Sequence, residues 1–356
     1  MSLSTKKTYE RYKKMYDSMY TFSLCQESEI NEVVRFIDSY WKKNHILVRS
    51  RNLLDWQYKN NSNNTYNFII ARSRSTEEIH AIEGFIPTTQ FDPSIENAMT
   101  WGAIWKTIPE LAPPGLGFVV KQFREEKYET KYNCEVGISS DARIYNTTFG
   151  NTIFELENWY IVSPYKTEFE LIEATKDVNN KKKCSDDAIN SILVSSTEWN
   201  ERAERLSIPE YKSKLYYINR YFNHPIYEYH AIILFDNTLE TQEALFYRIA
   251  EHKGNRCIFI VDYIGDGKVL ANSNKILCNI IEQNNAEYIL FPNFGINEKY
   301  LNKAGFKSTK QTQDIIPMYY EPFVKKNVVI ACASKSDSVS WCVFKGDSDQ
   351  DRPNCM

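Results

Sequence analysis

The chain has 356 residues, 42% of them hydrophobic and 25% charged, which is the composition of a folded soluble protein. Its length suits two domains of ordinary size better than a single core. The formal net charge is −3 with both signs interspersed, which argues against a dedicated nucleic-acid binder.

The N-terminal stretch, residues 4–20, is basic and rich in tyrosine, but it lacks the apolar core of a signal peptide. No uninterrupted run of 18 apolar residues occurs in the sequence, so no membrane-spanning helix is predicted. We therefore expect a cytoplasmic protein that does not bind a membrane.

The 8 cysteines are scattered, with no close pair and no spacing typical of a metal site. Cys257 and Cys332 lie in apolar, strand-like runs, where a small buried thiol is the usual interpretation. We expect no disulfide framework and no bound metal.

The first half of the chain alternates between strand and helix patterns. β-Branched and aromatic runs predict strands, and apolar residues three and four apart predict helices. In chain order the elements are a strand at 20–26, helices at 29–43 and 52–60, strands at 66–73, 79–87 and 99–106, a helix at 118–128, a strand at 133–139, a helix at 141–149 and a strand at 152–162.

The second half repeats this order. Its first strand is predicted at 169–174, although that segment is equally well interpreted as the last strand of the first half. The remaining elements are helices at 186–195 and 211–222, strands at 227–235, 244–252 and 256–264, a helix at 268–285, a strand at 286–293, a helix at 296–304 and a strand at 314–323.

Two landmarks place the halves in register. The glycine pair of Gly115-Leu116-Gly117 recurs as Gly265-Asp266-Gly267, 150 residues later. Tyr145 lies five residues before a glycine, and Tyr300 does the same, 155 residues later. Together with the repeated order of elements, these landmarks favour a tandem duplication.

The sequence therefore predicts an α/β (α+β) fold of two tandem units, each a mixed, mostly antiparallel sheet flanked by helices. We place the N-terminal unit at 1–165, the C-terminal unit at 166–335 and a C-terminal tail at 336–356. The stretch 176–187, rich in Lys, Asn and Asp, is predicted to be a linker or surface loop.

The segment IPELAPPGLGFVV, residues 108–120, places two glycines between a predicted strand and a predicted helix. Glycine lets the backbone come close to a phosphate, and a helix start offers free N–H groups and a positive dipole end. Lys121 lies one turn further and adds a cation. A plain strand-to-helix turn is the alternative interpretation.

Each unit resembles the GNAT (GCN5-related N-acetyltransferase) superfamily, most strongly at this segment. In that superfamily an Arg or Gln, two variable residues and Gly-x-Gly or Gly-x-Ala hold the diphosphate of coenzyme A on backbone amides. The resemblance implies acetyl-CoA or another acyl-CoA as co-substrate. It also implies that the cofactor is contacted by Pro114, Gly115, Leu116, Gly117, Phe118 and Lys121.

The two loops depart from the superfamily pattern in different ways. Ala112 stands at the Arg or Gln position of the first unit, whereas Asp262 stands there in the second unit. Asp266 also lies inside the second loop, and two carboxylates would repel a diphosphate. We expect one CoA per chain, in the first unit, with the second unit contributing to the acceptor site.

Four residues are candidates for acid–base catalysis. The resemblance places Tyr145 near the position of a tyrosine that protonates the leaving thiolate, although the familiar spacing to the glycine is four residues rather than five. His224 precedes a proline between aromatic runs, Glu83 interrupts an apolar strand, and Asp262 ends the strand before the second glycine loop. A structural role is the alternative for each of them.

The terminal stretch 344–354, FKGDSDQDRPN, has alternating aspartates. An EF-hand calcium loop needs Gly at its sixth place, where this chain has Arg352. Two interpretations remain. Either the stretch is a solvated acidic tail, or it folds back so that Asp351 and Arg352 contact a polyhydroxylated or diphosphate-bearing substrate.

With its two GNAT-like units and its C-terminal stretch 344–354, the chain resembles bacterial sugar N-acyltransferases of surface-polysaccharide pathways. The resemblance implies acyl transfer from acyl-CoA to the amine of a nucleotide-linked amino sugar. Two alternatives stay open: a Fem-type aminoacyltransferase that uses aminoacyl-tRNA, and a non-catalytic metabolite-binding protein. The sequence does not determine the amino sugar, the acyl group or the oligomeric state.

Overall fold

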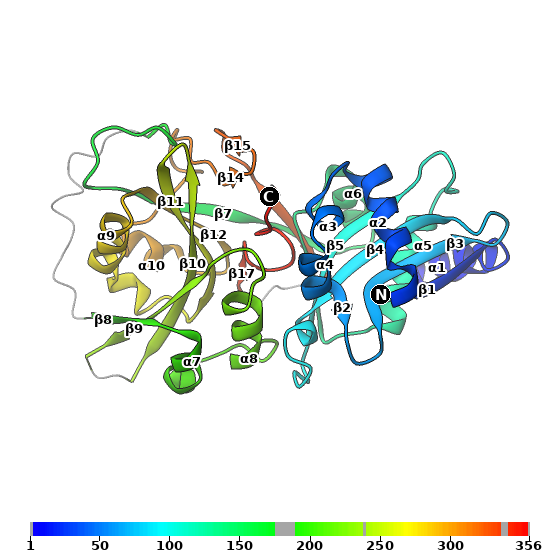
Figure 1. Cartoon of the computed structure of the whole chain (residues 1–356), viewed down its shortest axis with the longest axis horizontal. Coiled ribbons are helices and arrows are strands. Elements are labelled where there is room, and N and C mark those ends of the chain that lie inside the picture. Colours follow the sequence, from blue (N-terminus) through cyan, green and yellow to red (C-terminus); the bar gives the residue numbers. More distant parts are fainter. Residues whose placement is uncertain (1–2, 175–188, 238–239, 336–340, 355–356) are drawn as a thin grey trace. The chain divides into compact units, whose positions relative to one another are not determined.

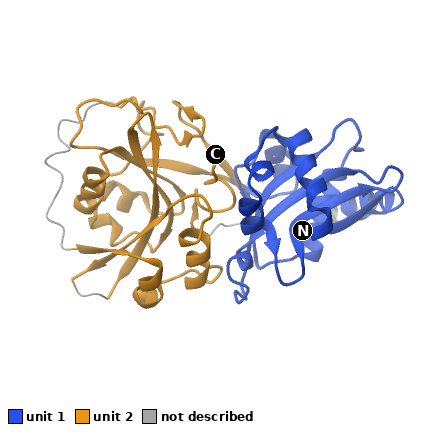
Figure 2. Ribbon diagram, viewed as in Figure 1, with its two compact units in different colours: residues 1–153, 333–337, 356 blue, residues 154–332, 338–355 orange. Residues whose placement is uncertain are grey.

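The structure is a computed structural model that describes residues 3–174, 189–237, 240–335 and 341–354. The chain divides into two compact units, which are coloured in Figure 2. Unit 1 comprises residues 1–153 with 333–337, and unit 2 comprises residues 154–332 with 338–355. The predicted linker at 176–187 lies outside the described residues.

The elements of unit 1 are labelled in Figure 1. Its main helices are α1 (Leu3–Tyr16), α2 (Ile30–Phe36), α3 (Ile46–Arg49), α4 (Arg51–Tyr58), α5 (Leu116–Lys127) and α6 (Ser140–Thr148). Its strands are β1 (Tyr20–Gln26), β2 (Lys59–Asn60), β3 (Thr65–Ser73), β4 (Ile79–Pro87), β5 (Met99–Thr107) and β6 (Tyr132–Val136).

The sheet of unit 1 has the order β1-β3-β4-β5-β6. The first four strands are antiparallel to their neighbours, and β6 is parallel to β5. Strands β3 and β4 are buried along almost their whole length, including the polar side chains of Asn67, His80 and Glu83. The ladder between β5 and β6 covers only Met99–Gly102 and Tyr132–Glu135, although β5 continues to Thr107.

Helix α1 packs along α5 and completes one side of the unit 1 core (Figure 1). Tyr9 donates a hydrogen bond from its hydroxyl to Glu126, and its ring lies edge-on to Phe118. The tyrosine-rich N-terminal stretch is therefore an amphipathic helix whose rings face the protein.

Unit 2 contains most of the remaining elements. Its main helices are α7 (Ser196–Arg202), α8 (Lys214–Tyr217), α9 (Asn274–Gln283) and α10 (Glu298–Lys303). Its strands include β7 (Thr152–Val162), β8 (Ile189–Val194), β9 (His230–Asp236), β10 (Gln242–His252), β11 (Asn255–Ile264), β12 (Ala286–Phe294), β13 (Lys307–Ser308), β14 (Tyr319–Tyr320), β15 (Phe323–Val324) and β17 (Val343–Phe344). Strand β16 (Ile330–Ser334) begins in unit 2 and ends in unit 1.

The sheet of unit 2 has the order β7-β12-β11-β10-β9-β8. Strands β8 to β11 are antiparallel to one another, β12 is parallel to β11, and β7 is antiparallel to β12. The succession of three antiparallel strands and one parallel pair is the same as in β3 to β6 of unit 1. The segment 152–162, which we assigned to the N-terminal unit, pairs with β12 and lies mostly in unit 2.

Several predicted elements differ from the structure. The segment 189–194, predicted as part of a helix, is strand β8, because it pairs with β9 along its whole length. The segment 169–174 is not a strand and makes only one bridge, from Glu173 to Ile315. Of the strand predicted at 314–323, only Ile315, Tyr319–Tyr320 and Phe323, the first residue of β15, are paired.

Two cysteines and the lengths of the helices agree with the sequence patterns over the described residues. Cys257 and Cys332 are buried, as predicted. Within those residues, no helix combines the length and the apolar character needed to cross a bilayer.

Candidate functional site

The first glycine loop forms a tight entry into helix α5. Gly115 has φ +90°, a left-handed conformation that favours glycine, and it is the N-cap residue of the helix. Gly117 lies against the end of β5, where an added Cβ would be 3.1 Å from Thr107 and 3.3 Å from the indole of Trp105. Both glycines therefore allow a close approach between the loop and its surroundings.

The start of α5 has amide groups that the described residues do not use. The amide of Leu116 donates to the Pro113 carbonyl at 3.1 Å, and that of Val119 donates to Gly115 at 3.1 Å. Among the described residues, the amides of Gly117 and Phe118 donate no hydrogen bond. Such amides at the positive end of a helix are suited to bind an anion.

The second glycine loop is already filled by a carboxylate of the protein. Glu243, on β10, is only 1% exposed and accepts from the amides of Gly267 at 2.8 Å and Leu270 at 2.6 Å. Its carboxylate also accepts from the hydroxyl of Tyr263. At Gly265, an added Cβ would lie 2.5 Å from the Glu243 side chain. The loop amides that a diphosphate would use are therefore occupied.

Glu243 also explains why the predicted helix at 268–285 starts late. Because the amides of Gly267 and Leu270 bind its carboxylate, the chain forms turns there, and α9 begins only at Asn274. Asp266 is instead exposed and pairs with Lys268 at 2.5 Å. The acid that fills this loop comes from a neighbouring strand, which sequence reasoning missed.

The C-terminal segment lies at the place where β11 and β12 stop pairing with each other. Strand β17 pairs with β12 at Asn293 and Phe294, and the Gly346 amide donates to the Val261 carbonyl of β11 at 2.7 Å. The segment thus bonds to both strands of the parallel pair within unit 2. The interpretation of a solvated acidic tail is therefore wrong for residues 343–351.

Asp351 is bound by the protein itself. Its carboxylate accepts two bonds of 2.8 Å from Arg248, one of 2.8 Å from Tyr229, and lies 3.2 Å from the ammonium of Lys345. These groups hold the pKa of Asp351 far below its usual value, against the opposing effect of burial. Arg352 forms an ion pair with Asp349. The fold-back occurs, but the contacts favour a structural role for both residues over substrate binding.

Asp262 is also part of an internal ion cluster in unit 2. It is fully buried and accepts from Lys212 at 2.7 Å and from Tyr221 at 2.7 Å. Lys212 also pairs with Asp347 at 3.0 Å. The amine that Asp262 binds thus belongs to the protein, and this geometry favours a role in stability.

His224 is half-buried and shapes the turn that follows it. Its Nδ1 accepts from the amides of Ile226 at 3.1 Å and Tyr227 at 2.8 Å. Burial and the neighbouring positive charge of Arg220 lower the pKa of His224 to about 3. A base this weak does not suit proton abstraction near neutral pH, so the contacts favour a structural histidine.

Glu83 belongs to a buried polar cluster between the sheet of unit 1 and α5. Its Oε1 accepts from Arg124 at 3.2 Å, and Arg124 lies 3.6 Å from Glu125. Burial raises the pKa of Glu83. Lys335 pairs with Glu125 at 2.5 Å. Glu83 Oε2, Gln122 Oε1 and Arg124 Nη1 are buried and make no hydrogen bond among the described residues. Polar atoms in this state usually bind water or a ligand.

Trp105 links the glycine loop to the buried cluster. Its indole N–H donates to the Gly117 carbonyl at 3.1 Å, and the Lys121 ammonium lies 5.5 Å from its ring. Lys121 also pairs with Glu135 and is 3% exposed, so its charge is directed into the protein. Tyr145 packs on Trp105 with 4.9 Å between ring centroids.

Of the residues predicted from the sequence, the structure brings Gly117, Phe118, Lys121, Glu83 and Tyr145 together in unit 1. Trp105, Arg124, Glu125 and Glu135 join them and were missed. A polar residue inside a strand was the signal that singled out Glu83, and the same signal exists at Glu135, in the segment NCEVGIS.

No protein-family model and no curated protein matches the sequence. Among solved structures, a conserved Enterococcus faecalis protein described as a probable N-acyltransferase matches with a TM-score of 0.51 and 11% identity, over 88% of this chain and 72% of that one. A GCN5-related N-acetyltransferase from Kribbella flavida matches with a TM-score of 0.42 and 12% identity, over 77% and 64%. Saccharomyces cerevisiae N-myristoyltransferase with bound myristoyl-CoA matches with a TM-score of 0.41 and 8% identity, over 89% and 79%. The first similarity shows the fold, and the predicted class of mixed, mostly antiparallel sheets flanked by helices is confirmed.

Proposed function

We propose that the protein is an N-acyltransferase that binds acyl-CoA in unit 1 and transfers the acyl group to a small polar amine. The observation that carries this proposal is the difference between the two glycine loops. The amides of Gly117 and Phe118 are not used by the described residues, whereas the Glu243 carboxylate fills the corresponding loop of unit 2. An acyltransferase-like fold supports the same assignment.

In this proposal the diphosphate of CoA accepts from the amides of Gly117 and Phe118 at the start of α5. This helix has 12 residues, so its N-terminus has the positive potential of a full dipole. Helix α1 anchors the loop, because the hydroxyl of Tyr16 donates a hydrogen bond to the Pro114 carbonyl. Because Lys121 pairs with Glu135, the backbone amides are the main hydrogen-bond donors to the anion.

The reaction joins the acceptor nitrogen to the acyl carbon and breaks the bond from that carbon to the CoA sulfur. The nitrogen loses a proton, and the leaving thiolate gains one. The resemblance assigns the proton for the leaving thiolate to Tyr145, whose phenol is protonated at neutral pH because burial raises its pKa well above the usual value. Its hydroxyl accepts from Gln122 at 3.3 Å, which orients it.

For the acceptor we propose a nucleotide-linked amino sugar, on the basis of the resemblance to sugar N-acyltransferases. Acetyl transfer to UDP- and dTDP-amino sugars, detected by mass spectrometry, tests this assignment separately from the donor. If none of these sugars is acetylated but another small amine is, the proposed acceptor is wrong and the acyltransferase assignment stands.

The donor site is tested with Gly117→Asp and its matched control Gly117→Ala. Both variants add the same Cβ, 3.1 Å from Thr107, but only aspartate adds a negative charge where the diphosphate binds. Aspartate is well tolerated in the first turn of a helix, so the fold should be kept. We expect Gly117→Asp to bind acetyl-CoA at least ~10-fold more weakly than Gly117→Ala, with both proteins folded by circular dichroism. Wild-type affinity in Gly117→Asp would refute the site.

A further inference from the structure

Four buried polar side chains form a cluster between β4 and α5 in unit 1, here called the α5 cluster. Glu83 Oε1 accepts from Arg124 Nε at 3.2 Å, and Arg124 Nη2 lies 3.6 Å from Glu125 Oε1. Gln122 Nε2 donates to Glu125 Oε2 at 2.8 Å and to the hydroxyl of Tyr145 at 3.3 Å. The α5 cluster therefore connects to the phenol that the proposed function assigns to the leaving thiolate.

Three members of the α5 cluster carry polar atoms that make no hydrogen bond among the described residues. Glu83 Oε2 and Gln122 Oε1 are acceptors in this state, and Nη1 and Nη2 of Arg124 are donors. These side chains belong to residues that are 2%, 3% and 0% exposed, so bulk water does not reach them. Buried polar atoms in proteins normally bind an internal water or a ligand. Because acceptors and donors both lack partners, a group that accepts as well as donates, such as a hydroxyl, fits the cluster.

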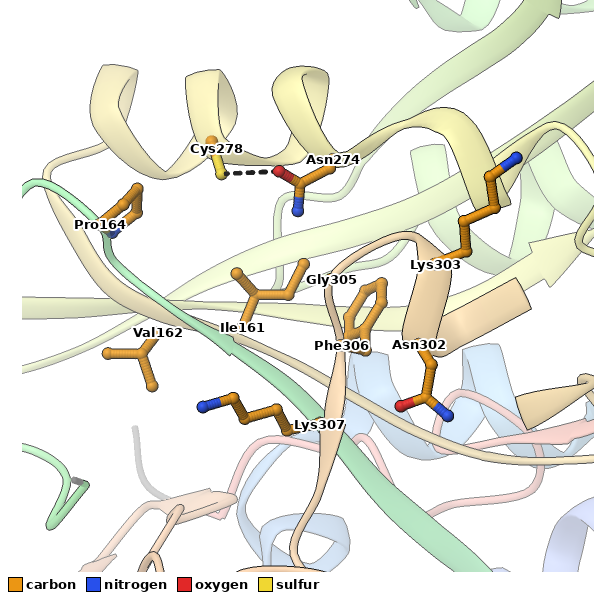
Figure 3. Close-up of a pocket in the computed structure, with 10 residues that line it drawn as sticks. All are labelled: Ile161, Val162, Pro164, Asn274, Cys278, Asn302, Lys303, Gly305, Phe306 and Lys307. Atoms are coloured by element: carbon orange, nitrogen blue, oxygen red, sulfur yellow. Dashed lines mark hydrogen bonds between the residues drawn. The ribbon is translucent and has the colours of Figure 1, made fainter. Parts of the chain in front are cut away.

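A cavity of about 410 Å³ in unit 2 lacks this signal. Its two lysines, Lys303 and Lys307, point away from each other (Figure 3). The amide of Asn274 is used within the protein, since Nδ2 donates to the Ala304 carbonyl at 2.8 Å and Oδ1 accepts from the Cys278 thiol. No described side chain that lines this cavity has a buried polar atom without a hydrogen bond. The stronger evidence for a polar ligand therefore lies in unit 1.

The α5 cluster lies beside a free edge of β5. The ladder between β5 and β6 stops at Gly102, whereas β4 pairs with β5 up to Thr107, so among the described residues no strand covers the β6 side of β5 between them. At about 3.3 Å per residue, this edge is ~16 Å long. It ends beside Gly117, and Trp105 within it is the cross-strand partner of Glu83.

This edge determines where an acyl group would lie in the proposed complex. The pantetheine arm of CoA is an extended chain of similar length, and its two amide groups suit it to pair with a free strand edge. With the diphosphate at Gly117, the arm brings the thioester to the level of Gly102, whose ladder partner is Glu135. Lys121 pairs with Glu135, and its ammonium lies 5.4 Å from the centroid of the Tyr145 ring. A long apolar chain among these charges is unfavourable, so the region suits a short acyl group.

We propose that the acyl group of the donor is short and carries a hydroxyl that bonds within the α5 cluster, with Gln122 Oε1 as its acceptor and Arg124 as the donor to its oxygen. This inference rests on the proposed function and names the class of acyl-CoA that the enzyme uses. The hydroxyl takes no part in the bond changes of acyl transfer. It adds affinity and selectivity for the donor.

The test compares butyryl-CoA with the two enantiomers of 3-hydroxybutyryl-CoA, which share its carbon skeleton and add only the hydroxyl. Binding is measured by calorimetry on the full chain without an acceptor. We expect one enantiomer to bind at least ~10-fold more tightly than butyryl-CoA, and octanoyl-CoA to bind more weakly than butyryl-CoA. Equal affinity for butyryl-CoA and both enantiomers, or tighter binding of octanoyl-CoA, would overturn the proposal. If no acyl-CoA binds, acetyl-CoA included, the donor site itself is wrong and this inference fails with it.

The position of the hydroxyl is tested with Gln122→Met and the control Glu126→Gln. The first change removes the unpartnered acceptor at similar size. Glu126 lies on the same helix but bonds to Tyr9 and Lys13, outside the α5 cluster. We expect the preference for the hydroxyl to disappear in Gln122→Met and to remain in Glu126→Gln. The preference is a ratio of two affinities within one protein, so a general weakening of donor binding cancels.

An unchanged preference in Gln122→Met would contradict the assigned acceptor. If that variant does not fold, as judged by circular dichroism, the comparison of butyryl-CoA with 3-hydroxybutyryl-CoA in the wild type still decides whether the donor carries a hydroxyl.

Discussion

At the scale of single residues, Glu243 determines what the second glycine loop does. Its carboxylate accepts hydrogen bonds from two backbone amides and a tyrosine hydroxyl, so these groups are not available to a bound anion. From the sequence, we expected repulsion by Asp262 and Asp266 to prevent CoA from binding in unit 2. In the structure Asp262 is paired with Lys212 and Asp266 is exposed, so the main obstacle is an internal anion.

Removing this carboxylate should destabilise unit 2 and open an anion site. Glu243→Ala leaves the buried amides of Gly267 and Leu270 without an acceptor, and each such group costs about 1–3 kcal/mol. We expect a loss of ~3 kcal/mol in the free energy of unfolding. Added phosphate should raise the melting temperature of the variant more than that of the wild type. Equal stabilisation of the two proteins by phosphate would show that the amides are not accessible in the variant.

At the scale of elements, the C-terminal segment is part of the core of unit 2 and not a tail. It supplies strand β17, and it also supplies Asp347 and Asp351, whose carboxylates pair with buried lysine and arginine side chains. Buried charges of this kind persist only when every partner is present, because an unpaired charge in the interior is costly. The C-terminal segment and strands β10 and β11 therefore stabilise one another.

Asp351→Asn should destabilise the protein by about 3–5 kcal/mol, since it leaves the charge of Arg248 buried without its partner. The control Glu251→Gln removes an exposed ion pair with Arg256 and should cost less than about 1 kcal/mol. Urea denaturation of both variants measures this difference. A cost for Asp351→Asn no larger than that of the control would contradict the structural role.

The same carboxylate should produce a pH dependence. The pKa of Asp351 is depressed in the folded state, so its contribution to stability is present above the unfolded pKa of about 3.9 and is lost as the pH falls below it. Stability curves for the wild type and Asp351→Asn should therefore approach each other on acidification. Parallel curves from pH 7 to pH 3 would argue against a depressed pKa.

At the scale of the whole molecule, the two units share an arrangement of strands but should differ in ligand binding. Unit 1 keeps the amides of its glycine loop available, whereas in unit 2 Glu243 fills the loop and the segment 343–346 bonds to both β11 and β12. The fold alone would suggest two CoA sites. Under the proposed assignment, the occupied groups in unit 2 leave one CoA site.

Calorimetric titration of the full chain with acetyl-CoA should therefore give a stoichiometry near one. Binding should be lost in Gly117→Asp, because the unit 1 loop, whose amides the described residues leave unused, then carries a negative charge. A stoichiometry near two, or binding that survives Gly117→Asp and disappears when Gly265 is substituted, would place the donor in unit 2.

The sequence by itself determined the class of fold and most of the element order, because these follow from local patterns: apolar periodicity, β-branched runs and glycines at helix starts. It also singled out the glycine loop of unit 1, where the required backbone conformation restricts the residue type. Only the tertiary structure decided which carboxylates are available. Glu243, Asp262 and Asp351 read alike as isolated acids in the chain, and their roles depend on amides and cations that lie far away in sequence. Segment 189–194 became a strand for the same reason, since its pairing with β9 outweighed an ambiguous local pattern.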